Sequence, residues 1–218
     1  LCPLHKSARC GTLLPAYRQE HPLHTLPAAE FANLHFVTPT LAVGGDISAY
    51  DDELAVMQFA EICSLGITHI VDVRLEWSDL DTFAQSAPHI GYLHHGMDDA
   101  GQAVPHDWFE QAVSWVEAAG PEAVVLAHCH MGINRGPSLG LALLLARGWD
   151  PVEAISAIRG ARPCANVWYA ADALAWHHER TGLDPATAAA QHAALQDWRD
   201  ANPLDVVRII RDQRANGF

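Results

Sequence analysis

A cysteine and an arginine separated by five residues are the side chains of this sequence that best fit covalent chemistry. Residues 123–138 read AVVLAHCHMGINRGPS and contain both Cys129 and Arg135. The apolar run before Cys129 is typical of a buried strand, and a helix is expected to begin near Arg135. A loop between such elements directs several backbone N–H groups to one point, at the positive end of a helix dipole. That environment favours a bound phosphate dianion and also a thiolate.

The residues of this loop have distinct expected roles. A free thiol titrates near ~8.5, and a helix N-terminus or a nearby cation lowers its pKa to about 3.5–7.5. We therefore expect Cys129 to be a thiolate at neutral pH and to attack phosphorus, while the planar guanidinium of Arg135 holds two phosphate oxygens. Gly132 permits close backbone approach because it lacks a Cβ atom. His128 is expected to orient the loop through hydrogen bonds.

The pattern His128-Cys129-x-x-Gly132-x-x-Arg135 resembles the signature of the cysteine-dependent protein tyrosine phosphatases, closest to the dual-specificity group. The similarity extends over about residues 34–175. The further matching segments are GITHIVDV at residues 66–73, Arg162-Pro163 and Asn166.

This resemblance implies a phosphatase that hydrolyses phosphomonoesters through a cysteinyl-phosphate intermediate. The implied substrates are phosphotyrosine and, in addition, phosphoserine or phosphothreonine, bound in a shallow pocket without a cofactor or a metal ion. The implied phosphate-binding residues are His130, Met131, Gly132, Ile133, Asn134 and Arg135.

The resemblance also implies a general acid, usually an aspartate on a loop about 30 residues before the cysteine. Asp98 and Asp99 both lie in the expected loop, and Asp99 fits the spacing to Cys129 better. A well-placed acid contributes on the order of 10²–10⁴ to the rate. We therefore favour Asp99 as the acid that protonates the leaving group and then activates water, and we interpret Asp98 as a solvated or capping residue.

Two positions depart from the family pattern. Gly136 stands where the family has a serine or threonine that helps to expel the thiolate, and Ser138 comes two residues later. Turnover of the phosphoenzyme is therefore expected to be slow, unless Ser138 reaches the sulfur from a shifted helix start. A phosphate-binding module without turnover stays an alternative on this ground. The second departure is Asp172, where many relatives have glutamine.

Composition narrows the class of protein and its partners. The chain has 218 residues and a formal net charge of −13, so nucleic acids and membrane surfaces are unfavourable partners. A phosphorylated protein or a small phosphoester fits better, with lipid head groups and RNA ends as alternatives. Five irregularly spaced cysteines indicate a reducing compartment, which predicts a cytoplasmic protein. Scarce lysine beside abundant alanine and arginine indicates a bacterial genome. The oligomeric state is not predicted.

Histidine and cysteine are frequent, yet no metal site is expected. The pairs His94-His95, His128-x-His130 and His177-His178 lack metal-ligand spacing, and the group Cys2, His5 and Cys10 is interpreted as part of a loose arm. Cys63 is expected in the core. An oxidised pair of Cys164 with Cys129 stays an alternative.

Alternating strand and helix patterns predict an α/β fold with a largely parallel sheet. Three regions are expected: an arm over 1–30, a phosphatase domain over 31–180 and a helical extension over 181–218 packed on it. The predicted strands are 34–37, 41–43, 67–73, 90–93 and 123–127. The predicted helices are 51–65, 106–119, 136–147, 150–159 and 166–180, with further starts at Asp184-Pro185 and Asn202-Pro203.

Overall fold

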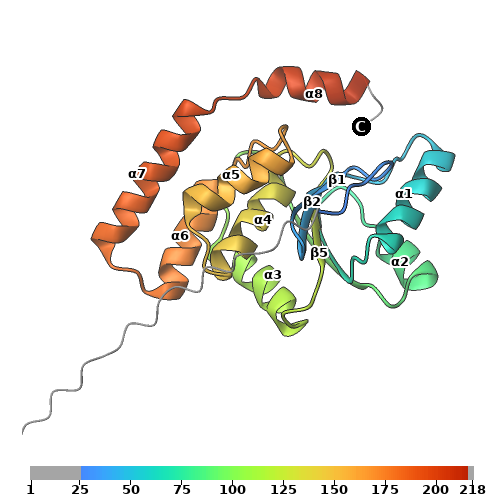
Figure 1. Ribbon diagram of the computed structural model, residues 1–218, viewed down its shortest axis with the longest axis horizontal. Helices are drawn as coiled ribbons and strands as arrows, with labels where there is room; N and C mark the ends of the chain where they lie inside the picture. The colour runs from blue at the N-terminus through green and yellow to red at the C-terminus, as the bar shows by residue number, and fades with distance from the viewer. Residues whose placement is uncertain (1–25, 216–218) are drawn as a thin grey trace, which may run out of the picture.

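A five-stranded sheet forms the centre of the computed structural model, which describes residues 26–215 (Figure 1). The strands are β1 (Leu34–Thr38), β2 (Leu41–Gly44), β3 (His69–Arg74), β4 (Gly91–Met97) and β5 (Val125–His128). Their order is β1-β2-β5-β3-β4, and every pair is parallel except the β1–β2 hairpin. The predicted α/β class with a largely parallel sheet is thus confirmed. Because β5 lies between β2 and β3, the loop after β5 is flanked by the carboxyl ends of two neighbouring strands.

Helices cover both faces of the sheet. Their bounds are α1 (Asp52–Ser64), α2 (Leu80–Ser86), α3 (His106–Ala118), α4 (Arg135–Ala146), α5 (Pro151–Ala161), α6 (Ala170–Thr181), α7 (Pro185–Ala201) and α8 (Val206–Ala215). The helices α1 and α2 lie on one face, and α3 to α6 lie on the other (Figure 1). Alternating strand residues divide between two cores, because successive side chains of a strand point to opposite faces. Ile70 and Leu126 pack toward α1 and α2, whereas Val71 and Val125 pack toward α3 to α6.

Local signals placed most helix starts correctly. The side chain of Asp150 caps α5 by accepting hydrogen bonds from two backbone N–H groups, and Asp184 caps α7 in the same way. A proline follows each aspartate at the first helical position, where no N–H group is needed. The helix predicted over 51–65 is α1, which the side chain of Asp51 caps.

Three predicted elements need correction, and one helix was not predicted. The strand predicted over 90–93 runs on to Met97, because β3 pairs with it that far. The short helix α2 was missed, since it spans seven residues and has no side-chain cap hydrogen bond. Residues 166–169 form a loop and α6 begins only at Ala170. The start of α8 is marked by Asp205, whose carboxylate accepts a hydrogen bond from Arg208 N, and not by Asn202-Pro203.

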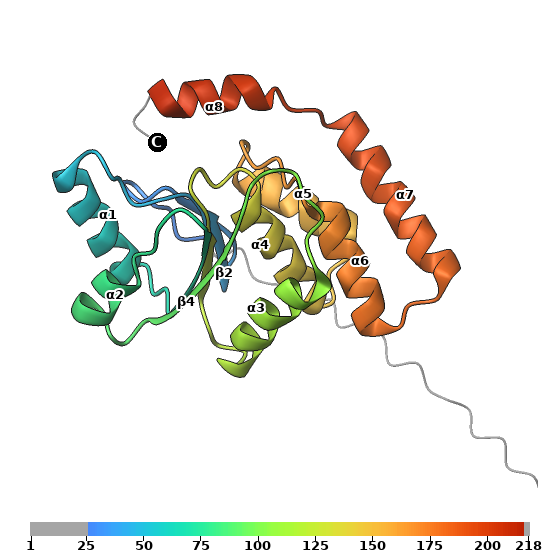
Figure 2. The same ribbon diagram turned by 180° about the vertical axis from the view of Figure 1, so that it is seen from behind.

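The last two helices lie beyond α6. The helix α7 packs against α5 and α6 and buries Leu195, whereas α8 turns away from α7 and is seen above β1 and β2 (Figure 2). Within residues 26–215 no helix is both long and apolar enough to cross a membrane. The sequence group Cys2, His5 and Cys10 lies outside the described residues.

Candidate active site

Cys129 lies directly after the central strand β5, at the start of a loop that ends where α4 begins. We call residues 129–134 the Cys129 loop. Its first residue is 2% exposed, and the backbone N–H groups of Gly132 and Gly136 interact with the Cys129 sulfur. The predicted arrangement of strand, loop and helix is therefore present, with the sulfur beside backbone donors at the positive end of α4.

Burial of the Cys129 sulfur opposes its expected ionisation. Burial raises the pKa of the Cys129 thiol, although the Arg135 cation and the N–H groups of Gly136 and Gly132 act in the opposite direction. Asp99 also raises this pKa by its negative charge. Sequence reasoning counted the loop donors and the cation but not the cost of enclosing the sulfur, which favours the neutral thiol.

Arg135 is the first residue of α4, and its guanidinium is paired with a carboxylate that sequence reasoning missed. Its Nη1 and Nη2 atoms donate to the two Glu76 carboxylate oxygens at 2.9 and 2.8 Å, and Nη1 also donates to Met97 O. This pairing lowers the pKa of Glu76 to about 2. Glu76 follows β3 at the carboxyl edge of the sheet, and that position was the only signal in the sequence. The positive charge that should favour a thiolate is thus largely balanced by Glu76.

Replacing Glu76 by glutamine is expected to make Cys129 more acidic. Without the carboxylate, the charge of Arg135 is available to the sulfur, so the pKa of Cys129 should fall by about one unit. The measurement is the pH dependence of iodoacetamide labelling at Cys129, followed by mass spectrometry of its peptide. Glu53→Gln, an exposed change on α1, is the matched control. An unchanged or higher midpoint in Glu76→Gln would contradict the balancing role.

Asp99 lies beside the Cys129 loop and is held there by two neighbours. Tyr169 Oη donates to its carboxylate at 2.9 Å, and Asn134 Nδ2 donates to the same carboxylate at 3.2 Å. The Arg135 Nε atom is 3.8 Å from Asp99. The Asp98 carboxylate instead accepts a hydrogen bond from the Asp99 backbone N–H group. The structure therefore brings Asp99, rather than Asp98, to the loop.

Tyr169 was missed by sequence reasoning because it fell within a segment predicted as helix. Its side chain is buried and reaches the 98–105 loop, where its hydroxyl also accepts a hydrogen bond from Gly101 N. Burial, together with the hydrogen bond to Asp99 and its negative charge, raises the pKa of Tyr169 to about 12. Tyr169 is therefore a neutral donor that can position the Asp99 carboxylate.

The Cys129 loop is supported from below by Arg162. This buried side chain donates to Gly132 O through Nε at 2.7 Å and to Met131 O through Nη2 at 2.9 Å. The other side of the loop is held by Asn166, whose backbone N–H group donates to Ile133 O at 2.8 Å. The Arg162 and Asn166 positions noted in the resemblance therefore hold the backbone of the loop.

Gly132 has a structural reason to be glycine. Its φ is +63°, in the region that side chains disfavour, and a Cβ atom there would lie 2.5 Å from Arg162 Nη2 and 2.6 Å from the Gly44 carbonyl carbon. Glycine is thus required at position 132 by the packing of the protein itself, apart from the space that a bound phosphate would need.

A buried charge network lies beneath the loop. The Arg74 guanidinium is 0% exposed and pairs with Asp72, Asp46 and Asp79. Asp46 extends the network to the loop, because its carboxylate is 2.7 Å from His130 Nδ1 and its backbone N–H group donates to His130 O. The His130 ring also packs edge-on against Trp77.

His128 belongs to the same network. Its Nε2 atom lies 3.7 Å from an Asp72 carboxylate oxygen, while its buried Nδ1 atom has no hydrogen-bond partner among residues 26–215. Burial lowers the pKa of His128, so a neutral imidazole is favoured.

Gly136 and Ser138 lie in the first turn of α4. A Cβ atom on Gly136 would lie 3.0 Å from Ala127 O and from two backbone atoms of His128, so a serine there would crowd the end of β5. Ser138 is buried one turn into α4, and its hydroxyl accepts a hydrogen bond from Tyr169 N at 3.2 Å. Ser138 thus supports the loop before α6. Asp172 lies on the first turn of α6.

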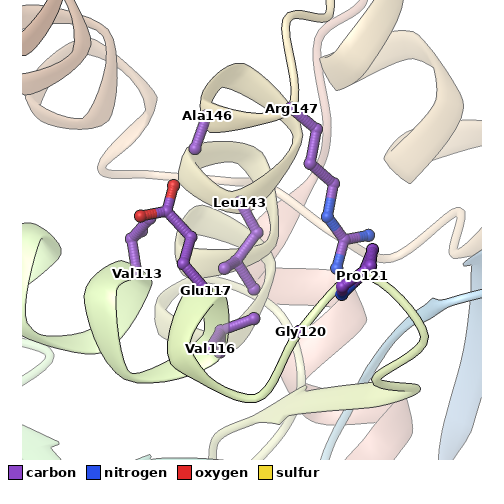
Figure 3. Close-up of a pocket in the computed structure, with 8 residues that line it drawn as sticks. All are labelled: Val113, Val116, Glu117, Gly120, Pro121, Leu143, Ala146 and Arg147. Atoms are coloured by element: carbon purple, nitrogen blue, oxygen red, sulfur yellow. The ribbon is translucent and has the colours of Figure 1, made fainter.

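The remaining sequence candidates lie apart from the Cys129 loop or make other contacts. Cys63 is half-buried on α1, and the Cys164 sulfur accepts a hydrogen bond from Gln213 Nε2. Among residues 26–215, no group of three or more histidine, cysteine or acidic side chains is arranged to hold a metal ion. A cavity of about 290 Å³ between α3 and α4 is lined by Val116, Leu143 and Arg147 among others (Figure 3). It lies at the opposite end of α4 from Cys129.

The family model described as "Dual specificity phosphatase, catalytic domain" matches residues 52–171. The chain belongs to the dual specificity phosphatase family. It is a cysteine-dependent protein phosphatase, as the similarity to a curated member also supports. That relative is dual specificity protein phosphatase 13B of Homo sapiens, 27% identical over 144 residues that cover 62% of this chain and 67% of the relative.

Two solved structures extend the comparison to the fold. Human DUSP28 has a TM-score of 0.54 and 21% identity, covering 72% of this phosphatase and 99% of that chain. PTPMT1 in complex with PI(5)P has a TM-score of 0.55 and 16% identity, with 69% and 97% covered. At these identities the likeness concerns the fold.

Proposed function

We propose that Cys129, Arg135 and Asp99 carry out the phosphatase reaction of this chain on phosphotyrosine-containing substrates, with phosphoserine and phosphothreonine as further substrates. The observation that carries the proposal is the convergence of Asp99 and the Arg135 guanidinium on the loop that encloses the Cys129 sulfur. The nucleophile, the acid and the cation thus come from the ends of β5, β4 and α4.

In the first step, the Cys129 sulfur forms a bond to phosphorus and the bond from phosphorus to the leaving oxygen breaks. Asp99 donates its proton to that oxygen. Arg135 and the N–H groups of residues 130–135 balance the charge of the phosphoryl oxygens. Burial raises the pKa of Cys129, so the thiol proton has to leave before the sulfur attacks; it passes to the phosphate dianion of the substrate, which leaves a thiolate beside Arg135.

In the second step, water attacks the cysteinyl phosphate and releases inorganic phosphate and the thiolate. Asp99 now accepts a proton from the water, which restores its acid form. The supporting residues of this proposal are His128, which lies beside Asp72 at the end of β5, and Ser138, which accepts a hydrogen bond from Tyr169 N in the loop before α6.

The second step is expected to be slower than the first, because Gly136 provides no hydroxyl to the departing sulfur. Rapid mixing with p-nitrophenyl phosphate should release close to one equivalent of p-nitrophenolate per protein before a slower steady rate. The phosphoenzyme should be detectable by mass spectrometry after acid quenching. Release that is linear from the first millisecond would contradict a slow second step.

A direct test of the function uses p-nitrophenyl phosphate with and without vanadate. We expect hydrolysis that vanadate inhibits, since vanadate mimics the phosphoryl group and should occupy the Cys129 loop. Folded protein that binds phosphate but releases no p-nitrophenolate would favour the alternative of a binding module without turnover.

The substrate class is tested by comparing phosphotyrosine, phosphoserine and phosphothreonine peptides with nucleotide, sugar and inositol phosphates. The specific alternative is a lipid or small-molecule phosphate, which the fold likeness to PTPMT1 bound to PI(5)P keeps in view. A higher kcat/KM for the inositol phosphates than for every peptide would overturn the proposed preference.

The proposal also includes the domain organisation, the cellular location and the origin of the enzyme. A phosphatase domain over 31–180 and a helical extension over 181–218 are supported by the packing of α7 on α5 and α6. The composition supports a cytoplasmic protein of bacterial origin, with phosphorylated protein or a small phosphoester as its substrate.

A further inference from the structure

The helix α8 carries three arginines on the outside of an otherwise acidic protein. Arg208, Arg211 and Arg214 follow one another at intervals of three residues, and the chain has a formal net charge of −13. Their side chains are exposed, to 70% for Arg208 and 74% for Arg211. In a helix, residues three apart differ by about 60° around the axis, so the three guanidinium groups share one side and span about 9 Å. No run of basic residues reveals this strip in the sequence.

The position of α8 relates this strip to the active site. Gln213 Nε2 donates to the Cys164 sulfur at 3.6 Å, which places α8 against the loop after α5. Two residues later in that loop, Asn166 holds the Cys129 loop through Ile133 O. In Figure 2, α8 lies along the same edge of the molecule as the top of the loop between β4 and α3.

The two sides of α8 differ in what they can contact. The side chains of Val206, Ile209 and Ile210 are half-buried, whereas the arginines face outward. An amphipathic helix that binds a bilayer inserts its apolar side, and here that side is turned partly inward. The outward side instead offers charge. Asp212 pairs with Arg208 at 3.5 Å and with Arg211 at 3.6 Å, so one carboxylate faces two guanidinium groups.

We propose that the arginine strip of α8 (Arg208, Arg211 and Arg214) is a docking surface for an acidic or multiply phosphorylated polypeptide segment that flanks the residue dephosphorylated at Cys129. This inference rests on the proposed function. A surface with a net charge of −13 repels an acidic substrate, and a local cationic strip counteracts that repulsion beside the site. An extended peptide rises about 3.3 Å per residue, so about three residues match the length of the strip.

The test compares two phosphotyrosine peptides that differ only in whether acidic or neutral residues flank the phosphotyrosine. In the combined variant Arg208→Gln, Arg211→Gln, Arg214→Gln, kcat/KM for the acidic peptide should fall about tenfold at low ionic strength, mainly through KM. The neutral peptide and p-nitrophenyl phosphate should change less than twofold. The matched control with lysine at all three positions keeps the charge and should retain most of the preference. Salt at about 1 M should remove the difference between the peptides, because the arginines are exposed.

The other outcomes are equally informative. An equal loss on both peptides and on p-nitrophenyl phosphate would show that α8 only supports the fold, and no loss on the acidic peptide would overturn the docking surface. If the wild type co-sediments with anionic vesicles and the glutamine variant does not, while the peptide kinetics of the two proteins are equal, the strip binds lipid instead. Wild-type protein that fails to hydrolyse p-nitrophenyl phosphate would overturn the proposed function itself, which is a different result from a missing peptide preference.

Discussion

Cys129→Ser is expected to lower kcat for p-nitrophenyl phosphate by a factor on the order of 10⁴ or more, because a serine hydroxyl is a far weaker nucleophile than a thiolate. The replacement is nearly isosteric at a residue that is 2% exposed, so the fold should persist. The measurements are the steady-state rate, the phosphoenzyme in acid-quenched samples, and the thermal unfolding midpoint as a check on folding.

The matched control is Cys164→Ser. Cys164 lies in the loop after α5, where its sulfur accepts a hydrogen bond from Gln213 Nε2 of α8. We expect this variant to retain activity within about twofold under reducing conditions. If Cys129→Ser kept more than a hundredth of the wild-type rate while Cys164→Ser lost its activity, the nucleophile would be misassigned.

Asp99→Asn has the second largest expected effect, a loss of about 10²–10⁴ in kcat that depends on the leaving group. Asparagine can keep the hydrogen-bonding position beside Tyr169 but carries no transferable proton. The loss should therefore be larger for phenyl phosphate, whose leaving oxygen is basic, than for p-nitrophenyl phosphate. The slope of log kcat against leaving-group pKa should become steeper in the variant.

Asp98→Asn is the control that the chain offers at the adjacent position. Its carboxylate accepts from the Asp99 backbone N–H group, and an amide oxygen can accept the same hydrogen bond. We expect a change of less than about threefold and an unaltered leaving-group slope. Comparable losses in the two variants would leave the acid unassigned, and a larger loss in Asp98→Asn would reverse the assignment.

The sequence alone predicted those features of the site that depend on residues close together in the chain. The loop from Cys129 to Arg135 could be placed because an apolar strand, a glycine-containing turn and a helix start follow one another within a few residues. The assignment of Asp99 rested on spacing, and the structure then brought this carboxylate, rather than that of Asp98, beside Asn134.

Residues that act across the fold could not be predicted in this way. Glu76 is 59 residues from Arg135 and Tyr169 is 70 residues from Asp99, so no local pattern links either pair. The pKa direction at Cys129 was wrong for a related reason. It depends on how deeply the sulfur is enclosed and on the carboxylate that balances Arg135, and both follow from tertiary packing.

The glycine-lined contact under the Cys129 loop has a consequence for mutational tolerance. Two stretches of backbone, residues 44–45 and 130–132, meet there with no room for a Cβ atom: one on Gly132 would strike the Gly44 carbonyl group, and one on Gly45 would lie 2.9 Å from His130 O. A random library selected solely for well-folded protein, with hydrolysis left unselected, should therefore still keep glycine at 132 and 45. The signature glycine would then persist even in descendants that had abandoned phosphate chemistry altogether.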